Sequence, residues 1–159
     1  MKLLIKQRVF SWADTYDVYD EHMVPVYDVQ AEVFTLGHRI HVYDKATGVE
    51  VASIRQKLMT FFPTFYLEMG GVPLGSIQRQ FSLLRPSYQL DMNGWTVTGD
   101  ILSWDYDVLD RKGCPVMHIS KEPFRWGDTY VLDIPDPGDA LICLLIAISI
   151  DAANCSSNH

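Results

Sequence analysis

The stretch DALICLLIAISIDAANC, residues 139–155, decides the fold. From Ala140 to Ile150 it contains one polar residue, Ser149, and no charged residue. Asp136 and Pro137 just before it are typical of a helix start, with aspartate as the N-cap and proline at the first helical position. The helix that follows would be hydrophobic on every side. Such a helix lies either in a membrane or at the centre of a protein core.

The length of this apolar run favours the core. Eleven residues rise about 16 Å at 1.5 Å per residue, whereas the hydrocarbon of a bilayer is roughly 30 Å thick. Asp139 and Asp151 bound the run, and a carboxylate is costly to place in lipid. We therefore expect no transmembrane segment and a helix surrounded by the rest of the chain.

The residues before the helix alternate between apolar and polar with the period of two that is typical of strands. About twelve short strands are expected, including TYDVYD, RIHVYD, TFYLEM and VPLGSIQRQ. Asn93-Gly94 is the strongest short signal for a hairpin, and residues 111–113 indicate another hairpin connection. The pattern predicts a mainly β protein, and no linker or change in composition separates a second domain from residues 1–159.

A closed barrel is the sheet arrangement that can bury a helix on all sides. Two packed sheets would leave one side of the helix exposed, and a polar stripe would be needed there. A barrel of about twelve strands has a lumen wide enough for one helix, and closure removes exposed edge strands. The sequence thus predicts a closed twelve-stranded antiparallel barrel that encloses a central hydrophobic C-terminal helix.

Composition limits the partners and the compartment. The net charge of −7 argues against general affinity for nucleic acid, which needs a cationic face. Cys114, Cys143 and Cys155 have no metal-ligand spacing and are expected to be reduced. The N-terminal apolar run is too short for a signal peptide, so we expect a cytoplasmic protein.

The order of elements resembles a known family. The run WDYDVLDRKGCPVMHISKEPFRWGDTYVLDIPDPGDALICLLIAISID, with KQRVFSWADTYDVYDE and VYDKATGVEVASIRQKL before it, is similar to the LURP-one-related (LOR), or YxjI-like, family. The resemblance covers nearly the whole chain. It implies the tubby-like fold, a twelve-stranded barrel around a central helix. Relatives of that fold bind phosphoinositide head groups, but the resemblance implies no established activity for this branch, because fold does not determine function.

Four cations form the candidate ligand site. Lys6 and Arg8 share one face of a predicted strand, and Arg55 and Lys57 share one face of another. If those strands are neighbours, the four cations make one basic patch on the outer surface, suited to phosphate oxygens; otherwise they are ordinary solvated side chains. Gln7 and Gln56 have the opposite phase and are expected to bond backbone groups, because an unpaired buried amide costs roughly 1–3 kcal/mol.

Metal and catalytic sites are not expected, and neither is a cofactor. Asp105 and Asp107 share a strand face but lack the calcium loop of an EF-hand, and His38 and His41 should point to opposite faces. Cys114 is a weak candidate nucleophile with His118 as its base. Residues that match a nucleophile elbow, a zinc motif or a phosphate loop are absent from the sequence.

Asp151 stands out because it follows the apolar run near the expected end of the helix. The helix dipole disfavours an anion there by some 0.3–1 kcal/mol, so a basic or hydroxyl side chain is expected beside it. The sequence favours a non-enzymatic cytoplasmic barrel that binds a phospholipid head group or a protein on its outer surface. The alternatives are a small-molecule carrier of the lipocalin type and an enzyme with an unrecognised site.

Overall fold

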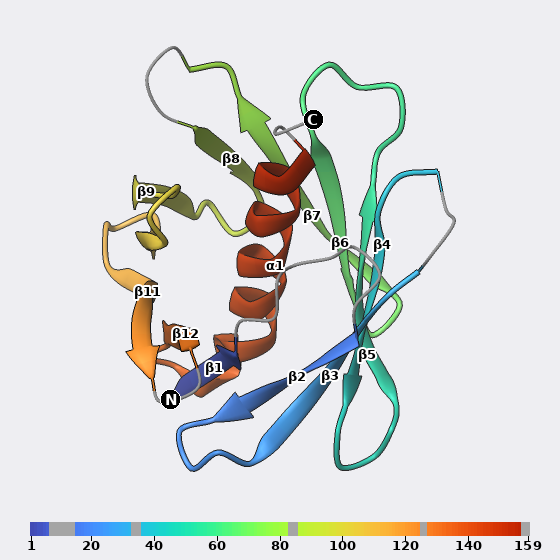
Figure 1. The fold of residues 1–159 in the computed structure, drawn as a ribbon. Coiled ribbons are helices and arrows are strands. Elements are labelled where there is room, and N and C mark those ends of the chain that lie inside the picture. Colours follow the sequence, from blue (N-terminus) through green and yellow to red (C-terminus); the bar gives the residue numbers. More distant parts are fainter. Residues whose placement is uncertain (7–14, 33–35, 83–85, 125–126, 157–159) are drawn as a thin grey trace.

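The computed structural model describes residues 1–6, 15–32, 36–82, 86–124 and 127–156 (Figure 1). Twelve strands are followed by a short 3-10 turn at Pro137–Asp139 and one helix, α1, at Ala140–Ser156. The strands are β1 (Lys2–Lys6), β2 (Thr15–Asp20), β3 (Pro25–Ala31), β4 (Arg39–Asp44), β5 (Glu50–Gln56), β6 (Thr64–Met69), β7 (Val72–Gln80), β8 (Ser87–Asp91), β9 (Thr96–Asp100), β10 (Asp105–Leu109), β11 (Pro115–Phe124) and β12 (Gly127–Asp133).

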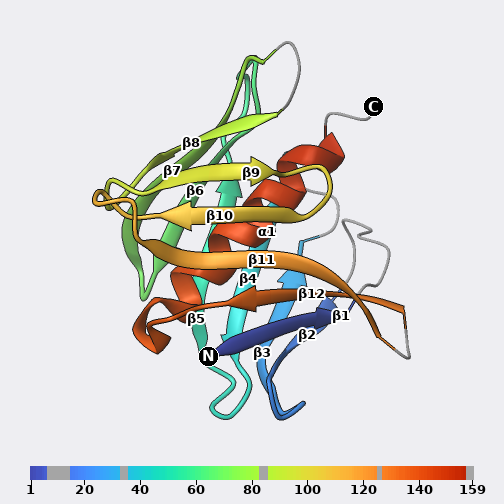
Figure 2. The same cartoon turned by 90° about the vertical axis from the view of Figure 1, so that its left-hand side faces the viewer.

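The strands form one antiparallel sheet that curls around the helix. Their order is β8-β7-β6-β5-β4-β3-β2-β1-β12-β11-β10-β9, so the first strand pairs with the last. The edge strands β8 and β9 come together and complete a nearly closed barrel (Figure 2). The predicted twelve-stranded barrel is confirmed, with a seam between β8 and β9 where no ladder joins the described strands.

The helix is the centre of the core, as the apolar run predicted. Cys143, Leu144, Leu145 and Ile146 are fully buried, and the inward-facing strand residues pack around them. Ser149 is also buried, and its hydroxyl donates to the Leu145 carbonyl at 2.7 Å, so it needs no partner from the sheet. The barrel supplies the apolar surroundings that a bilayer would otherwise provide.

The helix is longer than the apolar run, because it continues through Asp151 to Ser156. Within the part of the chain that the structure describes, the stretch Pro137–Asn154 is the one whose length and apolar composition would suffice to cross a membrane. Most of that stretch is buried inside the barrel. The predicted helix start is confirmed, because Asp136 Oδ1 accepts a hydrogen bond from the Gly138 backbone N–H at 2.9 Å.

The hairpin predicted at Asn93-Gly94 is wrong. Both residues adopt the positive φ angles of a tight turn, 53° and 69°. The strands on either side, however, pair with β7 and β10 and not with each other. Met92 and Trp95 flank the turn and are buried in the core. Their burial draws the chain inward at the point where the two edges of the sheet meet.

Candidate functional site: an apolar rim around a pocket

The described cations of the predicted basic patch, Lys6, Arg55 and Lys57, do not lie on neighbouring strands. Lys6 lies on β1, whereas Arg55 lies on β5 and Lys57 directly follows it, and three strands separate β1 from β5. Neighbouring strands were the condition for one patch, and that condition is not met. Arg8 lies outside the described residues. A ligand role for any one of these side chains stays a prediction.

Lys57 belongs instead to a group of loops at one end of the barrel. The loops join β3 to β4, β5 to β6 and β7 to β8, and because these strands are consecutive and antiparallel the loops lie at the same end. We call residues 36–38, 57–63 and 81–82 of these loops the rim; the β3–β4 loop also contains Glu32, which is paired with His41, and the β7–β8 loop also contains Pro86. The end of α1 reaches the same side of the molecule (Figure 1).

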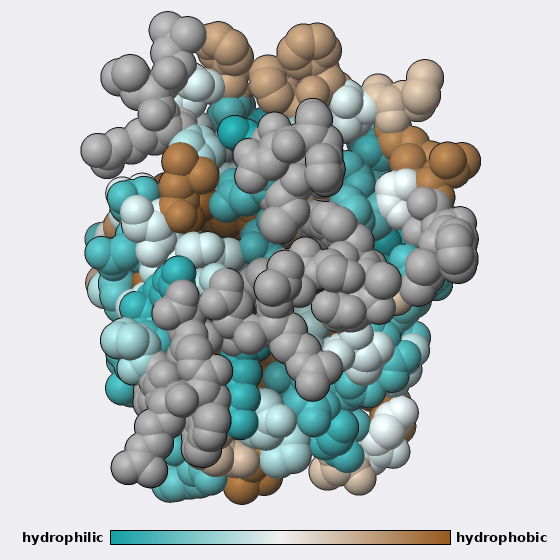
Figure 3. Space-filling model, viewed as in Figure 1, coloured by the Kyte–Doolittle hydropathy of each residue, from teal (hydrophilic) through white to brown (hydrophobic). Residues whose placement is uncertain are grey.

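Large apolar side chains project from the rim into solvent. Phe61 is 94% exposed, Leu36 84% and Phe81 71%, and Met59 is fully exposed. In Figure 3 tan and brown atoms gather along the upper edge of the molecule, the side on which Figure 1 shows the β5–β6 and β7–β8 loops. Single exposed apolar residues are ordinary, but a group of them on adjoining loops indicates an interaction surface.

Contacts between the loops hold the rim together. The Gln56 backbone N–H donates to the His38 carbonyl at 2.8 Å, and Gln56 Oε1 accepts from the His38 N–H at 3.0 Å. The Phe62 ring packs at 5.1 Å from Phe61 and 6.4 Å from Phe81, measured between centroids. The backbone-bonding role predicted for Gln56 is confirmed, and Gln7 lies outside the described residues.

A pocket of about 630 Å³ opens within the rim. This volume lies in the range of small-molecule sites. Its walls combine apolar and aromatic side chains with a few polar ones, and the lining residues are Gly37, Gln56, Lys57, Leu58, Met59, Thr60, Phe61, Phe62, Pro63, Arg79, Gln80, Phe81, Ser82 and Pro86. The apolar walls and the two cations make the pocket amphipathic.

Charge is distributed unevenly around the barrel. Residues 36–43, 51–67 and 72–82 contain four Lys or Arg residues and none of the 20 Asp and Glu residues of the chain. At the opposite end, Asp20, Asp44 and Asp110 each accept hydrogen bonds from backbone N–H groups in tight turns. The part of this end that the rim occupies is therefore cationic and apolar, whereas Asp100, Asp105 and Glu122, on β9 to β11, lie at the same end on the other side of the barrel.

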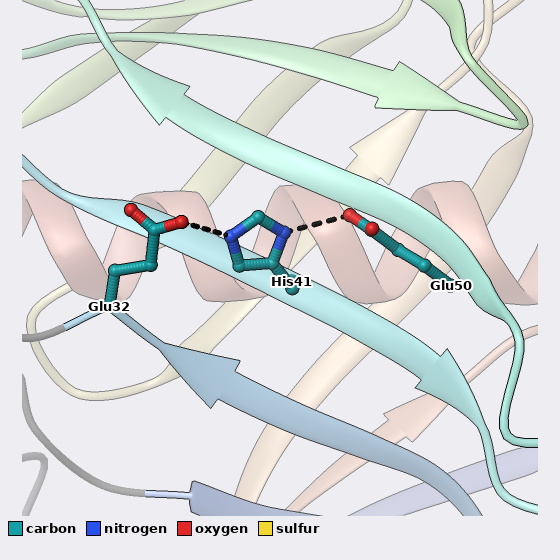
Figure 4. A network of polar contacts seen from close by, with 3 residues as sticks. All are labelled: Glu32, His41 and Glu50. Atoms are coloured by element: carbon teal, nitrogen blue, oxygen red, sulfur yellow. Dashed lines mark hydrogen bonds and ion pairs between the residues drawn. The ribbon is translucent and has the colours of Figure 1, made fainter.

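The other ionisable clusters have structural explanations. His41 bridges Glu32 and Glu50 on the outer face, with both nitrogen–oxygen distances at 2.8 Å (Figure 4). The two carboxylates raise the pKa of His41 even though partial burial opposes them. His38 stacks on Phe65, and burial lowers its pKa. Among the described residues, no group of three or more His, Cys, Asp or Glu side chains is arranged to hold a metal.

His118 forms a second small network. Its Nδ1 lies 2.8 Å from Asp107 Oδ1, and its Nε2 lies 3.6 Å from Asp105 Oδ1. The sequence placed the two carboxylates on one face but did not associate them with His118. Cys114 is an exposed free thiol, and its backbone N–H is bonded to Asp110. The histidine is thus engaged with carboxylates on the neighbouring strand β10.

A second cavity, of about 370 Å³, lies over the outer face of strands β4 to β8. Arg39 and Arg55 line it together with Glu68 and Asp91, so its charges are mixed. The Arg55 guanidinium lies 5.0 Å from the centre of the Tyr66 ring, a cation–π contact that holds it against the sheet. This cavity is less suited to an anion than the rim pocket, which no carboxylate lines.

Asp151 is buried without the expected partner. It is 7% exposed, and its side chain forms no hydrogen bond or ion pair with any described residue. Burial alone raises the pKa of its carboxyl to about 7. Tyr16 and Tyr106 have raised pKa values, first because of burial and then because of the Asp151 charge, and the Tyr106 hydroxyl has no hydrogen-bond partner among the described residues. The predicted basic or hydroxyl side chain is thus not bonded to Asp151 among the described residues, although the two tyrosines lie near enough for its charge to raise their pKa values.

The comparisons with known proteins agree with this architecture. The model of the LURP-one-related (LOR) family matches residues 1–151. The chain belongs to the LURP-one-related family. It is 30% identical over 151 residues to the uncharacterised protein YxjI of Bacillus subtilis (strain 168), an alignment that covers 95% of this chain and 92% of YxjI. A crystal structure of an Arabidopsis thaliana protein matches with a TM-score of 0.64 and 18% identity, over 94% of this chain and 89% of the plant protein.

Family membership establishes the fold and leaves the function open. The plant structure, at 18% identity, shows a shared fold. The LOR family and the uncharacterised YxjI indicate no enzymatic family. The candidate site therefore rests on the side chains of this chain. The signal that sequence reasoning missed is the run LMTFFP, residues 58–63, whose apolar residues fall in a connection between strands, where polar residues are usual.

Proposed function

We propose that this chain is a non-enzymatic cytoplasmic domain that docks on anionic phospholipid membranes through the rim. The observation that carries the proposal is the group of exposed apolar side chains at one end of the barrel, on loops whose one described carboxylate, Glu32, is paired with His41. Met59, Phe61 and Phe81 would enter the interfacial region of the bilayer, where amphipathic surfaces bury their apolar part. The nearby cations would attract anionic head groups, each by about 1 kcal/mol.

Charge complementarity supports an anionic membrane as the partner. The chain as a whole carries −7, so a uniformly distributed charge would repel such a membrane. Lys57 lies in the rim and Arg79 lines the pocket beside it, and the acidic turns at the other end lie about a barrel length away. Beyond a Debye length of about 8 Å those acidic turns are largely screened at physiological salt. The rim can then approach the membrane with a favourable local charge.

A carrier of the lipocalin type is less well supported. Leu144, Leu145 and Ile146 of α1 occupy the centre of the barrel, where a lipocalin ligand would lie. Neither the rim pocket nor the outer-face cavity is lined by residues of α1. Ligand chemistry would therefore take place at the barrel end or outside the sheet.

Vesicle binding tests the proposal. The protein is mixed with sucrose-loaded vesicles of phosphatidylcholine, or of phosphatidylcholine with about 30% phosphatidylglycerol, and the bound fraction is measured by sedimentation. We expect binding to the anionic vesicles that weakens as salt is raised. Phe61→Ser combined with Phe81→Ser should weaken it about tenfold or more, since burial of an aromatic side chain is worth roughly 1.5–3 kcal/mol.

The matched control removes two exposed apolar residues from the opposite end. Val24 and Val72 are 52% and 62% exposed and lie at turns away from the rim. Val24→Ser combined with Val72→Ser should leave vesicle binding within about twofold of the wild type. If the wild type binds no anionic vesicle at low salt, the proposal is wrong, and a protein surface becomes the better partner for the rim. Equal losses in the two double variants would also contradict it.

A further inference from the structure

We infer that the rim pocket is a discrete site for one phospholipid, in which Arg79 binds the head-group phosphate and the apolar walls contact the acyl chains. This inference rests on the proposed membrane docking and adds a specific ligand position to it. If the attraction were only a general electrostatic one, every cation at this end of the barrel would contribute equally to lipid binding. In a discrete site, one cation contributes much more to the affinity than the others.

The position of Arg79 sets it apart from the outer-face cations. Its backbone N–H donates to the Pro63 carbonyl at 3.0 Å, which fixes it beside the β5–β6 loop. Residues two apart on a strand share a face, so Arg79 has the phase of Ile77, which is fully buried in the core. Arg55 has the outward phase and is exposed. Arg79 is therefore at the mouth of the barrel, on the inner side, and half-buried.

No carboxylate neutralises Arg79 among the described residues, and the residues that line the pocket include no Asp or Glu. A partly desolvated cation without a counter-ion is unfavourable, and an incoming anion would relieve that cost. The guanidinium is a planar fork that donates two parallel hydrogen bonds to phosphate oxygens. A phosphate that enters the pocket would therefore supply the counter-ion that the described residues do not.

Gln56 offers a second donor in the same pocket. Its Oε1 is held by the His38 backbone N–H at 3.0 Å, so the amide has a fixed orientation. The amide NH₂ of Gln56 has no hydrogen-bond partner among the described residues, although the residue lines the pocket. An NH₂ group and a guanidinium lining one pocket supply several donors for a single phosphate.

The pocket walls suit the apolar part of the same ligand. Leu58 and Phe62 line the pocket beside Arg79, and Phe81 joins them from the next loop. These side chains also form part of the rim that would face the bilayer. A lipid could therefore enter with its head group at Arg79 while its acyl chains stay among apolar side chains and neighbouring lipids. Free phosphate would use the cation and leave the walls unoccupied.

The experiment compares Arg79 with an equivalent charge outside the pocket. The full chain is titrated with monomeric dihexanoyl-phosphatidylglycerol below its critical micelle concentration, and the Kd is followed by ¹H–¹⁵N NMR, including the Arg79 side-chain Nε–H signal. We expect that signal to shift on binding. Arg79→Gln should weaken binding about tenfold or more, because a hydrogen bond to a charged group is worth roughly 1.5–3 kcal/mol. Arg55→Gln should change it less than about twofold.

Two further measurements distinguish a discrete lipid site from simple charge attraction. Arg79→Lys keeps the charge but loses the planar pair of donors, so we expect it to recover only part of the affinity. A dispersed NMR spectrum shows that each variant is folded. Inorganic phosphate should bind at least about tenfold more weakly than the short-chain lipid. Equal binding of the two would overturn the lipid assignment. Equal losses in Arg79→Gln and Arg55→Gln would overturn the discrete site, while vesicle binding by the wild type would still uphold the docking proposal.

Discussion

Between pH 5 and pH 8 the unfolding free energy of the wild type is expected to fall by roughly 2–3 kcal/mol because of Asp151, and Asp151→Asn should abolish that part of the fall. Burial raises the pKa of this carboxyl from 3.8 to about 7 in the folded protein. The unfolded chain therefore loses the proton near pH 4 and the folded chain near pH 7. Between these values the folded state binds more protons than the unfolded state, so stability falls as pH rises and levels off above pH 7.

The measurement is urea unfolding at several pH values for the wild type and Asp151→Asn. Two histidines also have shifted pKa values, because burial lowers that of His38 while Glu50 and Glu32 raise that of His41 against the effect of burial. Their contribution is common to both proteins, so the difference between the two pH profiles isolates Asp151. Asp133→Asn, which removes an exposed carboxylate on β12, should leave the profile unchanged. An identical pH profile for Asp151→Asn would mean that a counter-ion compensates the buried charge.

The physical origin of this sensitivity is the same enclosure that defines the fold. A helix buried on every side also buries the residues that follow its apolar run, and Asp151 is carried into the barrel with Ala152 and Ala153. The sequence marked Asp151 as unfavourable and led to the expectation of a partner. Sequence patterns could not show that a neutral carboxyl, rather than an ion pair, is how the core tolerates it.

Local sequence patterns predicted which residues form strands better than they predicted which strands lie next to one another. The alternation in TYDVYD and RIHVYD gave the strands and their inward faces, because period two is a property of one strand alone. The same alternation put Arg55 and Lys57 on one face but could not say which strand lies beside them. Strand order depends on pairing between distant segments, and a single strand's pattern carries no such information for the predicted basic patch.

The rim was missed for a similar reason. Phe61 and Phe81 lie outside the predicted strands TFYLEM and VPLGSIQRQ. Only the observed strand order shows that the loops that carry them lie at the same end of the barrel. The Asn93-Gly94 turn shows the opposite error, since a correct local turn was assigned a strand pairing that the seam prevents. At this turn the closure of the barrel overrides the local signal.

Gly75, on the strand next to the seam, is a demanding backbone position, and Gly75→Ala is expected to destabilise the protein by about 3 kcal/mol or more. Gly75 has φ +153°, which L-residues rarely adopt. A methyl group there would overlap the Asp91 carbonyl oxygen and lie 2.9 Å from Met92 Cβ. Both contacts are with the end of the edge strand β8 and the buried residue after it, so the strand cannot move without disturbing the core.

Gly48→Ala is the matched control, because Gly48 also has a positive φ, +70°, but no atom lies within 4 Å of the added methyl group. It should cost about 1–2 kcal/mol, the penalty for an L-residue in the left-handed region. Urea unfolding of both variants separates the cost of the positive φ angle from the cost of the steric overlap. Equal losses of unfolding free energy would show that β8 can shift to accommodate the methyl group. A larger loss for Gly75→Ala would mean that β7 holds β8 in place. The Tyr88 hydroxyl bonds Asn154 of α1 from that same strand, so a fixed β8 also ties the end of the helix to the unpaired edge of the barrel.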